Sequence, residues 1–158
     1  MVNKRRVLKI VLLVLMAATL GFIFVNSCLP SDVSSAESDA VGGFIASIFP
    51  EDTWMYEFLS NNIRKLAHFS EFGAFGAEIA IYVFLFFEDT RRAVLLSLPI
   101  PFFAGFFDET IQIFSGRGPM ISDVWIDVFG YFTFFAVCLV IMTVADRLKR
   151  KNKHDTEK

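Results

Sequence analysis

Four long apolar runs dominate the pattern of this chain. They cover residues 7–25, 66–87, 93–113 and 121–145, and short polar or charged segments separate them. A helix needs about 20 apolar residues to cross the hydrocarbon core of a bilayer, and each run is close to that length. The runs are continuous rather than alternating, which indicates helices. We therefore predict an all-α integral membrane four-helix bundle, with helices over about residues 7–27, 65–88, 92–113 and 121–146 of a single domain, 1–158.

The composition strengthens the membrane assignment. The chain has 158 residues, of which 54% are hydrophobic, and it contains 20 phenylalanines. Its mean hydropathy is +0.53. An ordinary soluble domain is more polar than this. Cys28 and Cys138 belong to different apolar segments, so the cysteines indicate neither a disulfide framework nor a zinc site.

The first apolar run has two interpretations. Basic residues precede it, as in a cleaved signal peptide, and the letters VNSC before Leu29 resemble a lipoprotein cleavage site. However, Asn26 is unusual in such a site, and the run is longer than the apolar part of most signal peptides. We favour an uncleaved membrane helix.

The basic residues predict the orientation. Four Lys or Arg side chains lie in the N-terminal arm, two in the 88–93 turn and six in the tail from residue 146, whereas residues 28–64 hold six acids and one base. Basic segments stay on the cytoplasmic side of a membrane. We expect both termini in the cytoplasm, with a cytoplasmic tail over 147–158. The loop over 28–64 and the turn over 114–120 should then face outside.

The predicted outer loop divides into two parts. Residues 29–43 are small and polar, as in flexible segments. Residues 44–62 are amphipathic, and Trp54, Tyr56 and Phe58 suit the membrane interface. We expect a short interfacial helix from about Glu51, with the acids at its start stabilising its first turn. An anchoring role is the simpler interpretation of this helix, ahead of ligand binding.

Charged and amide side chains gather where three predicted helices reach the outer surface. Within each helix they are three or four residues apart, which places them on one side. An ionisable group inside a membrane costs at least ~2.5–3.5 kcal/mol at the helix centre, so such groups usually face a bundle interior or a wet cavity. The pattern predicts one polar pocket in the outer leaflet. Its candidate residues are Lys65, His68, Glu71, Asp108, Glu109, Gln112, Arg117, Asp123 and Asp127.

Local features fit a structured site. Gly116 and Gly118 permit an unusual turn around Arg117, and Ser122 is a candidate N-cap for the fourth helix. Pro99 and Pro101 predict a kink or break in the third helix. Gly73 and Gly76 would allow close helix packing. Glu78 lies deeper in the second helix and needs either a polar partner or a neutral form.

These segments carry a family resemblance. The stretch KLAHFSEFGAFG, from Lys65, resembles a conserved motif of the VanZ-like membrane proteins. A longer motif of that family is similar to DETIQIFSGRGPMISDVWIDVFG, from Asp108, and the family's serine-rich segment is similar to NSCLPSDVSSAES, from Asn26. The chain departs from the family at Asp127, where many relatives have Asn, and at Thr133 or Phe134, where many have Gly. The resemblance implies a bacterial cell membrane protein associated with tolerance to teicoplanin-type glycopeptides, with no settled reaction.

The first functional hypothesis is a binding site for an envelope lipid. Arg117, Lys65 and His68 would hold the phosphate or carboxylate of a lipid-linked cell-wall precursor, or the site would hinder an acylated glycopeptide. Asp108 and Glu109 would contact hydroxyls or amines. Teicoplanin carries an acyl chain, so this hypothesis predicts more protection against teicoplanin than against vancomycin.

The second hypothesis is a membrane enzyme acting on such a lipid. Its candidate catalytic residues are His68, Glu109 and Asp123, with His68 as a general acid or base. Mg²⁺ or another divalent cation would be held by carboxylates, and the candidates are Asp108, Glu109, Asp123 and Asp127. The chain has no H-E-x-x-H motif, nucleophile elbow or P-loop. No residue is therefore assigned as a metal ligand.

The third hypothesis is a structural scaffold. Lys65 and Arg117 would neutralise nearby carboxylates and so orient three helices, and breaking one buried pair typically costs about 3–5 kcal/mol. A transporter is the weakest option, because four helices without a repeat would have to form a homo-oligomer. The basic tail beside a membrane helix indicates topology and contact with membrane lipids rather than nucleic-acid binding.

Overall fold

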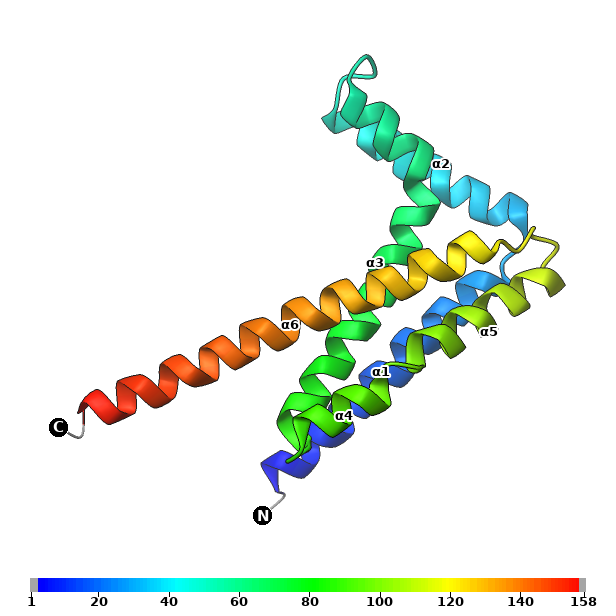
Figure 1. Ribbon diagram of the computed structural model, residues 1–158. Helices are drawn as coiled ribbons and strands as arrows, with labels where there is room; N and C mark the ends of the chain where they lie inside the picture. Colours follow the sequence, from blue (N-terminus) through cyan, green and yellow to red (C-terminus); the bar gives the residue numbers. More distant parts are fainter. Residues whose placement is uncertain (1–2, 157–158) are drawn as a thin grey trace.

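A computed structural model describes residues 3–156, without the side chains of residues 37 and 154–156. The ends of the predicted domain, residues 1–2 and 157–158, lie outside the described residues. Within them the structure is all-helical and has no strand (Figure 1). Its helices are α1 (Lys4–Cys28), α2 (Ser31–Ile48), α3 (Trp54–Phe86), α4 (Thr90–Ser97), α5 (Ile100–Phe114) and α6 (Ile121–Thr156).

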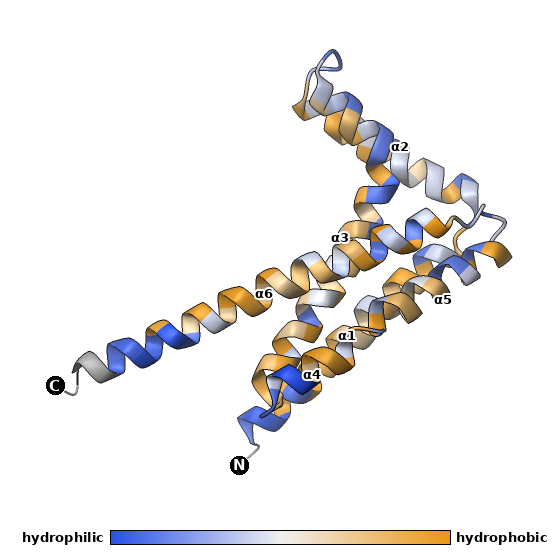
Figure 2. Ribbon diagram, in the orientation of Figure 1, coloured by the Kyte–Doolittle hydropathy of each residue, from blue (hydrophilic) through white to orange (hydrophobic). Residues whose placement is uncertain are grey.

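The four predicted membrane helices are confirmed by length and composition. Spans of membrane length and apolarity are α1, α3, the joined α4 and α5 (Thr90–Phe114) and α6 as far as Lys153. Their outer faces carry many exposed aliphatic and aromatic side chains, among them Val14, Phe103 and Phe129. Figure 2 shows this apolar surface along the helices and the polar end of α6. Such faces suit lipid contact.

The region predicted as an outer loop is helical instead. Residues 31–48, expected to be a flexible segment in their first part, form α2. This helix packs along the first turns of α3, so the two make a helical hairpin at one end of the bundle (Figure 1). Ser35 and Ser38 of α2 donate to the carbonyl four residues earlier, and Ser47 donates to the carbonyl three residues earlier, so these side chains bond to the helix itself.

The predicted short helix from Glu51 is also corrected. The helix begins at Trp54 and continues without interruption as the membrane helix α3, which spans 33 residues rather than the predicted 65–88. Thr53, and not an acid, is the N-cap residue, and its hydroxyl accepts from the Tyr56 N–H. The amphipathic stretch is therefore the first part of a helix about 50 Å long, at 1.5 Å per residue.

The predicted break in the third membrane helix is confirmed. α4 ends at Ser97, and α5 starts at Ile100, just after Pro99. Proline leaves carbonyls of the preceding turn without a donor. The Tyr131 hydroxyl on α6 donates to the Ser97 carbonyl over 3.5 Å. A neighbouring helix thus supplies the expected partner.

The core forms where α3 crosses α6, the largest helix contact. The two backbones touch at glycines: a Cβ on Gly76 would lie 2.3 Å from the Tyr131 carbonyl oxygen, and one on Gly130 2.3 Å from that of Phe69. A ring of Phe134 covers Gly73 in the same way. The prediction that Gly73 and Gly76 allow close packing is therefore confirmed, and Phe72 and Tyr131 are fully buried beside them.

The described ends of the chain lie on the same side of the bundle. The start of α1 and the end of α6 are far from the α2–α3 hairpin, and the turn between α5 and α6 lies at the hairpin end (Figure 1). An even number of crossings requires such an arrangement. Which side is cytoplasmic remains a prediction.

Candidate functional site

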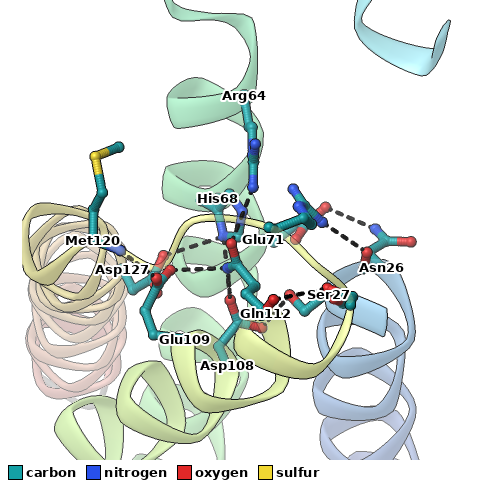
Figure 3. Close-up of polar contacts among 12 residues, drawn as sticks. Asn26, Ser27, Arg64, His68, Glu71, Asp108, Glu109, Gln112, Met120 and Asp127 are labelled. Atoms are coloured by element: carbon teal, nitrogen blue, oxygen red, sulfur yellow. Dashed lines mark hydrogen bonds and ion pairs between the residues drawn. The ribbon is translucent and has the colours of Figure 1, made fainter. Parts of the chain in front are cut away.

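Polar side chains from four helices meet beneath α2 (Figure 3). They come from the end of α1, the middle of α3, the end of α5 and the start of α6. In sequence these segments are far apart, yet each lies within a few turns of the hairpin end of the bundle. Six residues of these helix segments are buried: Ser27, His68, Asp108, Glu109, Gln112 and Asp127.

Asp108 accepts a hydrogen bond on each of its carboxylate oxygens. It is 0% exposed. Its Oδ1 accepts from the Ser27 hydroxyl over 2.5 Å, and its Oδ2 accepts from the Gln112 amide over 2.9 Å. Asp108 and Gln112 are one helical turn apart on the same face of α5, as their spacing predicted.

His68 bridges the carboxylates of two other helices. Its Nδ1 lies 3.7 Å from Asp108 Oδ2 and 3.4 Å from Asp127 Oδ1. Asp127 is also 0% exposed. Neither carboxylate oxygen of Asp127 has a hydrogen-bond partner among the described residues. The same is true of the His68 Nδ1. These three atoms, two of Asp127 and one of His68, are therefore buried in the cluster without a hydrogen bond to any described residue.

Glu109 has a different environment from Asp108. Its Oε2 accepts from the Met120 N–H over 2.8 Å, and its Oε1 accepts from the Gln112 amide over 2.9 Å. The side-chain oxygen Oε1 of Gln112 in turn accepts from Arg64 over 3.0 Å. Glu109 therefore holds the segment that leads into α6, and Gln112 connects Arg64 with both carboxylates of α5.

A second group of contacts ties the end of α1 to the turn after α5. The Asn26 amide donates to Glu71 over 3.1 Å, and the Asn26 carbonyl accepts from Arg117 over 3.1 Å. The Ser115 hydroxyl donates to the Ser27 carbonyl. Gly116, with φ of 72°, makes the turn that positions Arg117. The predicted special conformation is confirmed there.

Lys65 and Asp123 lie at the edge of the cluster. Lys65 is exposed and forms no ion pair within the part of the chain that the structure describes. Asp123 accepts from the neighbouring Ser122 hydroxyl. Because α6 already begins at Ile121, Ser122 is inside the helix, and the prediction that it is the N-cap is wrong. Glu78 is separate from the cluster and accepts from the Thr19 hydroxyl over 2.8 Å.

Two small cavities adjoin the cluster, and both reach Arg64 and His68. The first, of about 170 Å³, lies under α2. The second, of about 130 Å³, lies between the start of α6 and α3. The polar residues of the first cavity are Asn26, Ser27, Ser34, Ser38, Arg64, His68, Glu71 and Arg117. Those of the second are Asn61, Asn62, Arg64, Lys65, His68 and Asp123.

Several residues of this arrangement were not among the sequence candidates. Arg64 was counted only as the single base of the outer loop, and Asn26 only as an argument against cleavage. No charge or motif spacing marks Ser27 or Ser115 in the sequence. A neutral side chain at a helix end does not stand out by hydropathy, although the serine-rich segment that resembled a family motif begins at Asn26 and includes Ser27.

The group best suited to hold a metal ion is His68, Asp108 and Asp127. One ligand atom of each lies within 4.8 Å of the other two. The four carboxylates that the sequence suggested as cation ligands are not gathered in this way. Glu109 faces the Met120 N–H, and neither it nor Asp123 joins a metal-sized group among the described residues.

The fold and the cluster define a class: a multi-pass membrane protein of four helical spans, with a buried polar cluster near one end of the bundle. Comparison with family models identifies it further. The VanZ/LLP1 family model matches residues 8–142, most of the chain, and the protein belongs to that family. Searches of curated proteins and of solved structures found no significant match.

Proposed function

We propose that this protein binds the anionic head group of an envelope lipid in the outer leaflet of a bacterial cell membrane. The observation that carries the proposal is the cavity of about 170 Å³ beneath α2. Two guanidinium groups, Arg64 and Arg117, and the imidazole of His68 reach it. Ligand pockets for whole drug-sized molecules measure about 300–1,000 Å³, so this cavity suits a head group rather than a whole lipid.

The donors around the cavity match a phosphate or a carboxylate. Arginine presents a planar fork that binds either group with two parallel hydrogen bonds. Ser34 and Ser38 of α2 add hydroxyls on the opposite wall. Glu71, which also reaches the cavity, is held by Asn26 and would accept from a hydroxyl or an ammonium of the same head group. The site is therefore chemically suited to a polar head with a negative charge.

An apolar groove beside the second cavity would take the lipid chain. Aromatic side chains of α3, α5 and α6 line it, including Phe69, Phe102 and Trp125. Ile126 lines both this groove and the second polar cavity, where Lys65 supplies a further cation. A lipid whose head group reaches Arg64 from the side of the second cavity would thus keep its chain in the membrane.

The physiological consequence would be protection of the envelope. A bound lipid-linked cell-wall precursor is shielded from glycopeptides that recognise it at the membrane surface. Teicoplanin, whose acyl chain enters the membrane, would be affected more than vancomycin. This role requires the hairpin end of the bundle to face outside and both termini to lie in the cytoplasm, as the basic residues predict.

Lipid binding by the full chain tests the proposal. The protein is reconstituted in nanodiscs of zwitterionic lipid, and binding of a polyprenyl phosphate is compared with that of the corresponding polyprenol. Arg64→Gln removes a cation that reaches both cavities. Arg91→Gln is the matched control, because Arg91 is an exposed residue of α4, at the other end of the bundle.

The proposal predicts saturable binding of the phosphate and not of the alcohol. Charge-assisted hydrogen bonds contribute about 1.5–3 kcal/mol, so Arg64→Gln should weaken binding roughly 10- to 100-fold. Arg91→Gln should leave it unchanged. Equal binding of phosphate and alcohol, or equal losses in both variants, would contradict a specific head-group site.

A second candidate function is an enzyme that hydrolyses or transfers a phosphoryl or acyl group of such a lipid. The position of His68 favours it, because an imidazole between two carboxylates and beside both cavities can exchange a proton with a bound substrate. The test is turnover: phosphate or acyl release from envelope lipids by purified protein, lost in His68→Gln. Binding without any turnover would leave the lipid-binding function alone.

A further inference from the structure

We infer that His68, Asp108 and Asp127 form a binding site for one divalent transition-metal ion, of the Zn²⁺ type. The three residues come from α3, α5 and α6, so an ion there would join three membrane helices at a single point. The inference goes beyond the head-group site: His68 lines both polar cavities, but Asp108 and Asp127 line neither of them.

The spacing of the ligand atoms suits a small ion. Metal–nitrogen and metal–oxygen bonds to Zn²⁺ are about 2.0–2.2 Å, so ligand atoms at the corners of a tetrahedron around it lie about 3.4 Å apart. His68 Nδ1 is 3.4 Å from Asp127 Oδ1 and 3.7 Å from Asp108 Oδ2. Both distances exceed the usual 2.7–3.2 Å between the donor and acceptor atoms of an N–H···O hydrogen bond. These two separations match adjacent ligands of one ion, and the ligand atoms of the whole group lie within 4.8 Å of one another.

Unsatisfied ligand atoms provide the independent observation. Asp127 is 0% exposed, yet neither carboxylate oxygen has a hydrogen-bond partner among the described residues. The His68 Nδ1 has none either. A buried carboxylate normally receives two or more donors, because burial of an unpaired charge costs several kcal/mol. A cation placed between these atoms removes that cost.

The surrounding residues fix the third ligand. Ser27 donates to one oxygen of Asp108 and Gln112 donates to the other. Arg64 in turn donates to Gln112. Metal-binding carboxylates commonly have such outer hydrogen bonds, which orient them and tune their basicity. Since each carboxylate oxygen has two lone pairs, Oδ2 of Asp108 can accept from Gln112 and still bind the ion.

The donor set selects the kind of metal. Mg²⁺ and Ca²⁺ take oxygen ligands, whereas imidazole favours Zn²⁺, Fe²⁺ and related transition-metal ions. One nitrogen and two carboxylates leave at least one coordination position for water or a substrate oxygen, as in catalytic metal sites. The sequence-based enzyme hypothesis named Mg²⁺ or another divalent cation, with carboxylates as candidate ligands and no residue assigned. The competing explanation is a protonated His68 that neutralises Asp108 and Asp127 without any ion.

The test is metal binding by the purified full chain, carrying an affinity tag without histidines. The protein in detergent is stripped with EDTA and then titrated with Zn²⁺, and binding is counted by elemental analysis after gel filtration. Co²⁺ is used as a spectroscopic probe of a nitrogen and oxygen site. His68→Gln and Asp127→Ala remove ligands, and Asp123→Ala is the matched control from the same helix. Circular dichroism checks that each variant is folded.

The inference predicts one Zn²⁺ per native chain, and Co²⁺ absorption bands that Zn²⁺ displaces. Either ligand variant should weaken binding at least ~100-fold, Gln112→Ala about 10- to 100-fold, and Asp123→Ala hardly at all. Folded native protein that binds no stoichiometric metal would overturn the inference and support the protonated histidine. Equal weakening in Asp123→Ala and Asp127→Ala would also overturn it. Should both ligand variants fail to fold, the native stoichiometry and the Co²⁺ spectrum still decide.

Discussion

At the scale of single residues, the polar cluster depends on small neutral donors. Asp108 is buried in a membrane protein, and it receives its hydrogen bonds from Ser27 and Gln112 rather than from a lysine or arginine. The structural hypothesis expected Lys65 to neutralise a nearby carboxylate such as Asp108. Among the described contacts Lys65 forms no ion pair with Asp108. Neutral donors stabilise a carboxylate without neutralising it, so its charge stays available to a ligand or an ion.

The hydrogen bond from Ser27 gives a prediction. Ser27→Ala leaves a buried carboxylate oxygen of Asp108 without its donor, which costs about 1–3 kcal/mol. We expect a lower thermal midpoint of unfolding for the purified protein in detergent. Ser70→Ala is the control, because that hydroxyl is exposed and donates only to the Leu66 carbonyl of its own helix. Equal midpoints for the two variants would mean that the contact with Asp108 is unimportant.

The sequence could identify charged members of the cluster but not its neutral ones. Charges stand out against apolar runs, and counting residues from each run's end placed His68, Asp108 and Asp127 at one depth. Asn26 and Ser27 end the first run without any charge. Which atoms pair is a matter of helix rotation and side-chain rotamers, and these depend on the packing of all four spans.

At the scale of helices, the α2–α3 hairpin is the feature that the amino-acid composition of residues 29–43 did not predict. Residues 29–43 are small and polar, and they include two glycines, which predicts a loop. Much of a helix's stability in a protein comes from packing one face on a neighbour. In α2 that neighbour is the first part of α3. A Cβ atom built on Gly42 would lie 3.6 Å from the Cδ1 atom of Ile63. The contact cannot be seen in either segment alone.

Cross-linking tests the hairpin. In a background with Cys28→Ser and Cys138→Ser, the pair Gly42→Cys and Ile63→Cys should react with a short bis-maleimide. The fragments should then stay joined after cleavage at a protease site inserted between α2 and α3. Gly43→Cys with Ile63→Cys is the control, since a Cβ on Gly43 has no neighbour within 4 Å. Cross-linking of both pairs alike would indicate a loose segment rather than a packed helix.

The crossing of α3 and α6 gives a second prediction at this scale. Gly76→Ala places a methyl group 2.3 Å from the Tyr131 carbonyl oxygen, which is backbone and cannot turn away. Overpacking of this kind costs about 1–3 kcal/mol or prevents assembly. Gly21→Ala in α1 is the control, because its methyl group would have no neighbour within 4 Å. A thermal midpoint for Gly76→Ala at or above that of Gly21→Ala would contradict the described crossing.

At the scale of the whole molecule, the number of spans follows from the sequence because length and apolarity are local properties. The orientation rests on basic residues alone, and it determines whether the cluster faces outside. Gly118 lies in the turn at the hairpin end, and Glu88 in the turn at the opposite end. Both residues are exposed, so they are suitable reporters of topology.

Labelling of intact cells tests the orientation. In the background without native cysteines, Gly118→Cys should react with a membrane-impermeant maleimide in intact cells. Glu88→Cys should react only after the membrane is opened. The reverse pattern would place the cluster at the cytoplasmic surface and would contradict a role toward extracellular glycopeptides.

The most direct test of the central claim is the susceptibility of cells to teicoplanin and to vancomycin. A sensitive bacterium expresses the native chain, Arg64→Gln, Glu109→Gln or the control Arg91→Gln, with membrane abundance matched by immunoblot. If the polar site acts on the envelope, the native chain and Arg91→Gln protect against teicoplanin more than against vancomycin, and the other two variants lose that protection at equal abundance. Undiminished protection by Arg64→Gln and Glu109→Gln, or equal protection against both drugs, would contradict the account.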